Sequence, residues 1–288
     1  GSCVAQTMAK LLGIMYWLKN GVYVHFSATH LYQRRANKPS GGMGGIDVFN
    51  IAREGVTLEV LAPSQNMNDR QMDDVVIEEY KKEVGKVFKI LNYVVLPIRD
   101  IETIASVIET TGKGVMIWTF WRNDEWTEVP KIIYQNLDIN DPLNGRHSTS
   151  GVDFTLYEAE KAIIMDDSWG SSYGKAGQRV LKESFFKERN FFAAYPINFS
   201  FEVSPAPFAY KFTTGMVFSE NVVYLDEVKV LQDFLKSKGY FPTNIDSTGY
   251  YGAMTAKAVL KWQIANVAKF NTIDPHWTVA TLTELAGH

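Results

Sequence analysis

The spacing of apolar residues changes near residue 87, and this change constrains the fold of the chain more than any other feature. Before it, residues 3–19, 46–53 and 69–84 carry apolar side chains at helical spacing. A helical first half followed by a β-rich second half predicts an α+β fold with two lobes, and we expect the functional site in the cleft between them. The second half is expected to contain strands at 87–96, 114–121, 149–156, 160–166, 178–181 and 191–198, with a helix at 100–111.

Length and charge limit the classes of function. At 288 residues the chain exceeds the usual size of one domain, so two domains are expected. The formal net charge of −3 gives no electrostatic argument for binding nucleic acid or an anionic membrane. No run approaches the ~18 apolar residues of a membrane-spanning helix, and no signal peptide is recognisable. The histidines His25, His30, His276 and His288 show no metal-ligand spacing, so we expect no metal and no cofactor.

The chain contains a single cysteine, Cys3, at the head of the helix predicted over residues 3–19. An isolated cysteine is usually a small buried hydrophobic residue. In the first turn of a helix, however, unpaired backbone N–H groups and the positive end of the helix dipole favour the thiolate. His147 and Asp167 follow far downstream. Together the three residues form a thiol–imidazole–carboxylate set of the kind used in nucleophilic catalysis.

The order of these groups resembles that of the papain-like cysteine peptidases, and the resemblance covers roughly residues 1–200. The chain departs from the family pattern at Val4, where the family has an aromatic residue, at Asp167, where it has Asn, and at Tyr173, where it has a second tryptophan. The motifs that carry the resemblance are Gly-Ser-Cys-Val-Ala at 1–5, Phe-Ser-Ala-Thr at 26–29, the Gly41–Gly42 pair with Gly55 beyond it, and Asp-Ser-Trp-Gly-Ser-Ser-Tyr-Gly at 167–174.

The resemblance implies a two-lobed papain-like fold, with a helical left lobe and a β-rich right lobe, and the activity of a thiol protease. His147 would take the proton from Cys3, and the thiolate would attack a peptide carbonyl to form a thioester that water releases. Asp167 would accept the second N–H of the imidazole. The neighbouring Asp166 is the alternative, but adjacent residues of a strand point to opposite faces, which favours Asp167. Trp169 would shield this hydrogen bond and line the leaving-group side of the cleft.

Further residues are expected to bind a polypeptide substrate. In the papain-like interpretation, Gly41 and Gly42 lie on the cleft floor, where missing side chains let an extended backbone approach. The alternative for this glycine-rich stretch is a flexible loop. Arg146, next to His147, is expected to border the pocket for the second residue before the scissile bond and to favour acidic or polar side chains there.

The resemblance leaves the oxyanion hole incomplete. The family takes one donor from a Gln upstream of the nucleophile, and this sequence begins two residues before Cys3. Gln6 follows Cys3 on the helix and cannot take that role by motif. Because the loss of one oxyanion donor typically costs about 100-fold or more in rate, we expect a longer parent protein with an upstream Gln; the alternative is an impaired form.

A second pattern lies near the C-terminus. Residues 228–235 and 253–263 carry the apolar stripes of two helices, with Gly-Tyr at 239–240 and Gly-Tyr-Tyr-Gly at 249–252 between them. This framework resembles the small helical peptidoglycan-binding domain and implies a wall-targeting module. The alternative is a module that docks on the catalytic domain or on a protein partner. Ligand contacts are expected from the exposed loop around Tyr240, Phe241, Thr248 and Tyr250.

The two prolines Pro205 and Pro207 interrupt any regular pattern and indicate a linker. We therefore expect a papain-like peptidase domain at 1–203, a linker at 204–220 and a small, mostly helical domain at 221–288.

Three hypotheses for function remain. The first is a cysteine endopeptidase that cuts polypeptides, with a tail domain that targets or stabilises it. The second is a hydrolase that cuts the peptides of peptidoglycan, and the third is a non-catalytic wall-binding protein. The intact set of Cys3, His147 and Asp167 argues against the third. The tail implies a bacterial or bacteriophage protein that is secreted or located in the cell envelope, with peptidoglycan as a partner.

Overall fold

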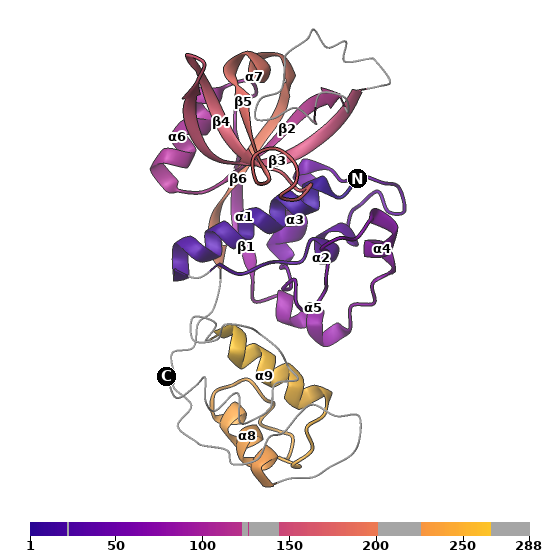
Figure 1. The fold of residues 1–288 in the computed structure, drawn as a ribbon. Helices are drawn as coiled ribbons and strands as arrows, with labels where there is room; N and C mark the ends of the chain where they lie inside the picture. Colours follow the sequence, from indigo (N-terminus) through magenta and orange to yellow (C-terminus); the bar gives the residue numbers. More distant parts are fainter. Residues whose placement is uncertain (22, 123–125, 127–143, 201–225, 266–288) are drawn as a thin grey trace. The chain divides into compact units, whose positions relative to one another are not determined.

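In a computed structural model, the chain divides into two compact units (Figure 1). The first contains residues 1–77 and 88–200, and the second contains residues 78–87 and 201–288. The linker predicted at 204–220 lies outside the described residues, and the predicted domain limits stay predictions. The structure describes residues 1–21, 23–122, 126, 144–200 and 226–265.

The central helix of the first unit is α1 (Cys3–Asn20), which confirms the helix predicted at 3–19 and extends it by one residue. One face is fully buried, with Met8, Leu11 and Leu12 at helical spacing. The helix ends at Gly21, whose left-handed backbone (φ 73°) lets its N–H bond the carbonyl of Trp17. The helices α2 (Ala28–Tyr32), α3 (Gly45–Glu54) and α4 (Asp69–Asp74) complete the helical lobe.

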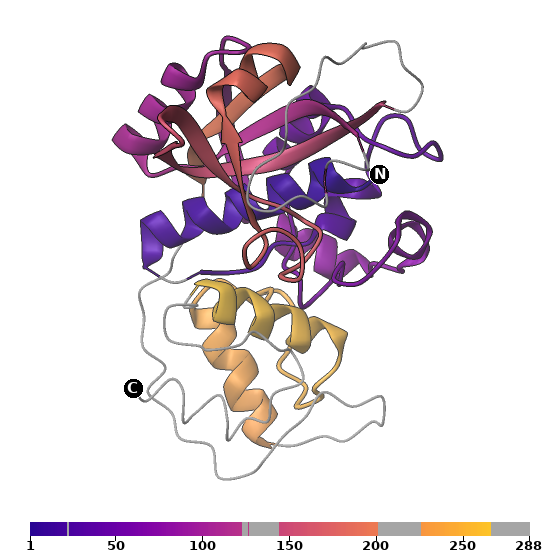
Figure 2. The ribbon, with the colours of Figure 1, turned by 45° about the horizontal axis from the view of Figure 1, so that its top comes forward.

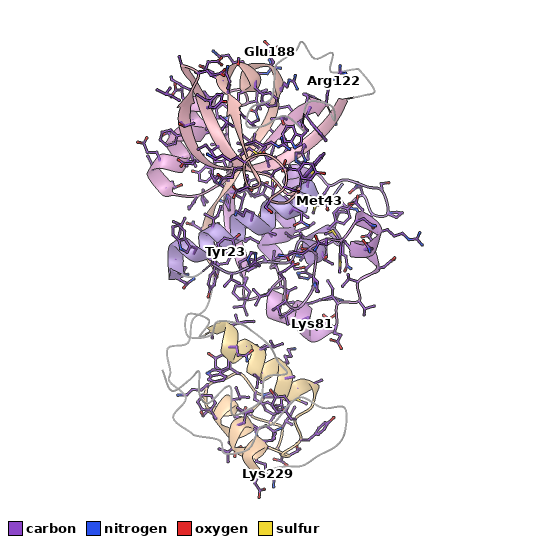
Figure 3. The ribbon with its side chains drawn as sticks, in the orientation of Figure 1. Tyr23, Met43, Lys81, Arg122, Glu188 and Lys229 are labelled. Carbon is purple, nitrogen blue, oxygen red and sulfur yellow. The ribbon has the colours of Figure 1, made fainter. Side chains whose placement is uncertain are left out.

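The second lobe of this unit is an antiparallel sheet with the strand order β1-β6-β2-β3-β4-β5 (Figures 1 and 2). Strand β2 pairs with both β6 and β3, and its residues are mostly buried because it lies inside the sheet. Figure 3 shows the side chains on this frame, with Arg122 at the end of β2. The elements of this lobe are β1 (Lys89–Val95), α6 (Ile101–Thr111), β2 (Val115–Arg122), β3 (Asn144–Tyr157), β4 (Glu160–Asp166), β5 (Gln178–Lys182), α7 (Glu183–Arg189) and β6 (Asn190–Ser200).

The single helix predicted at 69–84 is wrong. Helix α4 ends at Asp74, residues 75–78 are not helical, and a separate helix, α5 (Glu79–Gly85), follows in the second unit. Val75 is already extended (ψ 125°), and Val76 is 83% exposed rather than buried. The run Val75-Val76-Ile77 is β-branched throughout, and such side chains lose rotamer freedom in a helix, so the helix stops there.

A buried ion pair ties together the helical lobe, which has no disulfide because Cys3 is the only cysteine. The Arg35 side chain is 1% exposed and makes a bidentate contact to Asp73, with N–O distances of 2.7 and 2.6 Å. It also donates to the carbonyls of Tyr32 and Ser40 and lies over the Tyr32 ring. These contacts connect α2, α4 and the loop that leads to Gly41.

The second unit contains α8 (Asp226–Ser237) and α9 (Ala253–Ala265), with α5 packed on α9. Its core includes Val228, Leu231, Val259 and Trp262, as the two apolar stripes predict. Phe241 is also in this core, at 4% exposure, so the expectation that it forms part of an exposed binding loop is wrong. An aromatic ring next to a two-helix core stabilises the fold more when it is buried in that core than when it faces water.

Within the second unit, Gln232 is a buried connector. Its amide nitrogen donates to the carbonyl of Tyr250 and to Thr255 Oγ1, at 3.0 and 2.9 Å, and its amide oxygen accepts from the N–H of Gly249 at 3.0 Å. These bonds satisfy a polar side chain that is only 2% exposed.

In the part of the chain that the structure describes, no helix has the length and apolar character needed to cross a bilayer.

Candidate active site

Cys3 is the first residue of α1, so its thiol lies where the N–H groups of the first helical turn are unpaired. Burial alone would raise the pKa of this thiol. The hydrogen bond to His147 and the positive charge of that imidazole outweigh burial, with smaller help from the backbone of Ser148. The pKa of Cys3 is therefore lowered, which favours the thiolate.

His147 lies inside β3, opposite Thr119 of β2. The sequence predicts a strand only from residue 149, but the strand is longer and carries the imidazole on rigid backbone. The ring is buried, and its Nε2 is 2.8 Å from Asp167 Oδ1. Burial opposes the imidazolium, but hydrogen bonds to Asp167 and Cys3 and their negative charges prevail and raise the pKa of His147 to about 9.

Three tryptophans surround the imidazole. The ring centroids of Trp121, Trp126 and Trp169 lie 5.5, 5.2 and 6.0 Å from that of His147. The sequence predicts that Trp169 shields the hydrogen bond between the imidazole and the carboxylate. Its ring lies beside the imidazole, which is compatible with that role, and the role itself stays a prediction. Apolar rings around a hydrogen bond lower the local dielectric constant and strengthen the bond electrostatically.

Asp167 follows β4, and its side chain is fully buried. Oδ1 accepts from His147 and from the N–H of Ser168 at 2.7 Å. Oδ2 accepts from Trp126 Nε1 at 2.6 Å and from Arg179 Nε at 3.1 Å. Burial alone would raise the pKa of this carboxyl, but the contacts with His147, Trp126 and Arg179 lower it, so the group is ionised.

Sequence reasoning identified neither Arg179 nor Trp126 as a partner of Asp167. A signal for Arg179 exists in the alternation of β5, where Arg179 and Leu181 face inward and Gln178 is exposed. A charged residue at an inward strand position is rarely buried without a partner. Trp126 offers no comparable signal, because a lone tryptophan is most often a core residue.

Asp166 points away from His147, as the strand alternation predicts. It accepts from Lys10 Nζ at 2.8 Å and from Gln178 Nε2 at 2.9 Å. The first contact joins α1 to the end of β4, so it fixes the helix that carries Cys3 against the strand that leads to Asp167.

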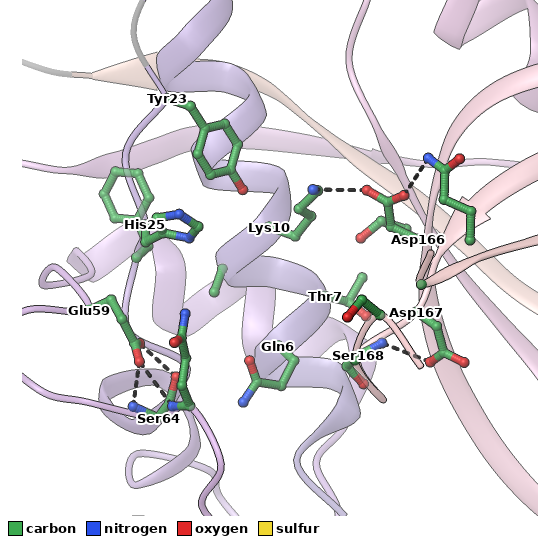
Figure 4. A pocket seen from close by; sticks show the side chains of 18 of the residues that line it. Gln6, Thr7, Lys10, Tyr23, His25, Glu59, Ser64, Asp166, Asp167 and Ser168 are labelled. Carbon is green, nitrogen blue, oxygen red and sulfur yellow. Dashed lines mark hydrogen bonds and ion pairs between the residues drawn. The ribbon is translucent and has the colours of Figure 1, made fainter. Parts of the chain in front are cut away.

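A cavity of about 530 Å³ lies along α1 and reaches Asp167 (Figure 4). Figure 4 shows Gln6 and Lys10 on the helix, with Tyr23 on one side and Asp166 and Ser168 on the other. Its lining includes both polar side chains, such as Gln6 and Lys10, and apolar ones, such as Phe26. A cavity of mixed polarity therefore adjoins the Asp167 carboxylate.

The glycine pair of the predicted cleft floor lies beside the segment that carries the thiol. A side chain on Gly1 would come within 2.7 Å of the backbone nitrogen of Gly42, which shows how closely the two segments pack. Gly41 is exposed, and Gly42 has a left-handed backbone (φ 79°) with open space where a Cβ would be. The carbonyls of both glycines accept from Asn37.

Arg146 is exposed on β3 and, because strand residues alternate, faces the side opposite to His147. Its guanidinium lies over the rings of Phe120 and Phe191, 5.7 and 6.0 Å from their centroids. Arg146 therefore packs on the two aromatic rings of Phe120 and Phe191.

Within the described residues, no group of His, Cys, Asp and Glu side chains is arranged to hold a metal ion.

Solved structures identify the fold of the first unit as that of the papain-like cysteine proteases, which confirms the predicted fold. Xylellain, a cysteine protease from Xylella fastidiosa, has 16% identity, covers 69% of this chain and 80% of its own, and has a TM-score of 0.57. The bromelain protease from Ananas comosus, in complex with the E64 inhibitor, has 16% identity, covers 69% of this chain and 89% of its own, and has a TM-score of 0.55.

Two proforms are matched over a smaller share of their length. The chain spans 58% of the proform of the ragweed pollen allergen Amb a 11, a cysteine protease, at 17% identity and a TM-score of 0.51. It spans 62% of digestive procathepsin L 3 from Tenebrio molitor larval midgut, at 17% identity and a TM-score of 0.50.

Residues 225–267 match the family described as "Putative peptidoglycan binding domain", which confirms the resemblance predicted for the C-terminal part of the chain. No curated protein is significantly similar in sequence to this chain. The molecule therefore combines the fold of the papain-like cysteine proteases with a C-terminal segment that matches the peptidoglycan-binding domain family.

Proposed function

We propose that the protein is a cysteine endopeptidase that hydrolyses peptide bonds. The observation that carries this proposal is the continuous chain of contacts from Cys3 through His147 to Asp167. A thiol at a helix N-terminus, an imidazole between thiol and carboxylate, and a carboxylate held by further donors provide a nucleophile, a general acid–base and an orienting group.

In the proposed mechanism, the thiolate of Cys3 attacks the carbonyl carbon of a peptide bond while the imidazolium of His147 holds the proton. The tetrahedral intermediate collapses when His147 donates this proton to the leaving nitrogen, which leaves a thioester on Cys3. Neutral His147 then takes a proton from water, and the hydroxide releases the acid product and the free thiol. The backbone N–H of Cys3 is one donor to the oxyanion.

The first test is covalent labelling by the epoxide E64, measured as intact mass. We expect one adduct at neutral pH in the wild-type protein, because the lowered pKa of Cys3 provides a thiolate to open the epoxide. Cys3→Ala, checked for folding by circular dichroism, is the control and should carry none. An unlabelled wild-type protein that is folded would contradict the proposed activity.

We further propose that the C-terminal module binds peptidoglycan and directs the peptidase to the cell envelope of a bacterium. The match of residues 225–267 to a peptidoglycan-binding family favours this function. It also favours the peptides of the wall as an alternative substrate class to polypeptides. Thr248 is exposed and Tyr250 is partly exposed, so these two residues of the expected binding loop remain available to a ligand.

Purified sacculi test both parts of this proposal. We expect the full chain to be depleted from solution by sacculi and not by cellulose, an insoluble glycan without stem peptides. Equal retention on both materials, or on neither, would contradict specific wall binding. If the wall is also the substrate, new amino groups should appear in sacculi treated with the wild-type protein and not with Cys3→Ala.

A further inference from the structure

Asp167 shares its carboxylate between two sets of partners. Oδ1 faces His147, whereas Oδ2 faces Trp126 and Arg179. The Arg179 side chain is 0% exposed and its guanidinium lies 4.8 Å from the centroid of the Trp126 ring, so arginine, indole and carboxylate form one packed cluster. Donors on Oδ2 fix the rotation of the carboxylate and therefore the direction of Oδ1.

We propose that Arg179 is a positioning residue that offsets the charge of Asp167. His147 then faces a hydrogen-bond acceptor, Asp167 Oδ1, that is held in a fixed direction, and the Asp167–Arg179 pair as a whole carries little net charge. This inference rests on the proposed function, in which His147 must both hold a proton and donate it. A bare carboxylate in a buried site stabilises the imidazolium strongly and would hold that proton back from the leaving group. The Arg179 cation weakens this effect without removing the hydrogen-bond acceptor.

The departure of this chain from the papain-like pattern has the same explanation. The family usually places an uncharged Asn where this chain has Asp167. A charged carboxylate together with a buried guanidinium presents His147 with about the same net charge as an amide. Asp167 and Arg179 should therefore act as a unit, and a change of one should be compensated by a change of the other.

The other charged groups near the imidazole do not take the place of Arg179 as a partner of Asp167. From α1, the thiolate of Cys3 acts on the imidazole through a hydrogen bond and its negative charge. Lys10 of α1 and Asp166 of β4 form their own ion pair at 2.8 Å. Among the described residues, Arg179 and the imidazolium of His147 are the cations that contact the Asp167 carboxylate, on Oδ2 and Oδ1 respectively.

The titration of His147 provides the test, followed by NMR of histidine-labelled full-length protein and assigned with His147→Ala. Arg179→Gln keeps a donor but removes the charge, so the pKa of His147 should rise by about one unit or more. Asp167→Asn should lower it by a similar amount, because Arg179 then acts alone. The double variant Asp167→Asn/Arg179→Gln should return close to the wild-type value.

A role limited to structure predicts a different pattern. If Arg179 only held the fold, both single variants would disorder the imidazole and lower its pKa, and the double variant would not recover. Arg179→Lys keeps the charge and should titrate like the wild type; a shift as large as that of Arg179→Gln would overturn the proposal. Should either single variant fail to fold, the double variant and Arg179→Lys still decide between the two roles.

These measurements are separate from the test of peptidase activity. If His147 titrates as expected but Cys3 does not react with the epoxide, the results support the Asp167–Arg179 charge pair and contradict the proposed peptidase function. If Cys3 reacts with the epoxide but Arg179→Gln leaves the pKa of His147 unchanged, the results support the peptidase function and contradict the proposed role of Arg179.

Discussion

Replacing His147 by alanine should lower kcat/KM for a peptide substrate by about 10³-fold, because the variant loses both the base that creates the thiolate and the acid that protonates the leaving group. Burial raises the pKa of the Cys3 thiol, and the contacts with His147 are the main cause of its net decrease. Without the imidazole, the thiol should be mostly protonated at neutral pH. The rate of alkylation of Cys3 by iodoacetamide should fall together with hydrolysis.

The pH dependence gives this prediction a second measurement. In the wild type, the thiolate–imidazolium pair exists above the lowered pKa of Cys3 and below the His147 pKa of about 9. Acid removes the pair by protonating the thiolate, and alkali removes it by deprotonating His147. We therefore expect a bell-shaped profile of kcat/KM with its alkaline limb near pH 9. A limb near the ordinary histidine value of about 6.5 would contradict the arrangement of Asp167 and Cys3 around the imidazole.

A matched control follows from the way the two residues cooperate. Residues that act as one catalytic unit show non-additive losses. Cys3→Ala/His147→Ala should therefore be no less active than Cys3→Ala alone. A further loss of tenfold or more in the double variant would indicate that His147 acts outside the proposed unit, for instance by supporting the fold of β3.

The fold could be predicted because its signals are local and repeated. Helical spacing in α1 and the runs of β-branched residues in β1 and β2 each extend over several residues, so a single exception does not hide them. Short elements carry too few repeats, and α2 and α7 were not predicted for that reason. The helix predicted through Val75 and Val76 failed because apolar spacing alone ignores the conformational preference of β-branched residues.

The candidate site was predictable only in part, because its partners come from distant segments. Cys3, His147 and Asp167 could be selected by their order and by the Ser-Trp-Gly motif. Arg179 and Trp126 contact Asp167 through the folding of β5 and of the chain after β2, and neither contact leaves a motif in the sequence. Phe241 shows the opposite error, since an aromatic residue in a polar loop was expected at the surface and lies in the core.

Replacing Asp73 by alanine should destabilise the first unit by about 3 kcal/mol, the lower end of the range for breaking a buried ion pair. Arg35 is 1% exposed and would keep its charge without its carboxylate partner, and this unpaired cation dominates the cost. We choose the lower end because the Asp73 side chain is 18% exposed, so water can reach the vacated position. Urea unfolding of the full chain, followed by tryptophan fluorescence, measures the change.

The neighbouring residue offers a matched control for this prediction. Asp74 is 72% exposed and meets Arg70 at 3.8 Å, and surface pairs of this kind contribute about 0–1 kcal/mol. Asp74→Ala should therefore cost less than about 1 kcal/mol; equal losses in the two variants would show that burial of Arg35 does not set the cost. The Arg35 contacts lower the pKa of Asp73, so its stabilisation is complete above the ordinary Asp value and is lost as the pH falls through the depressed value. The difference in stability between wild type and Asp73→Ala should shrink over that acidic range, because protonation removes the same charge that the substitution removes.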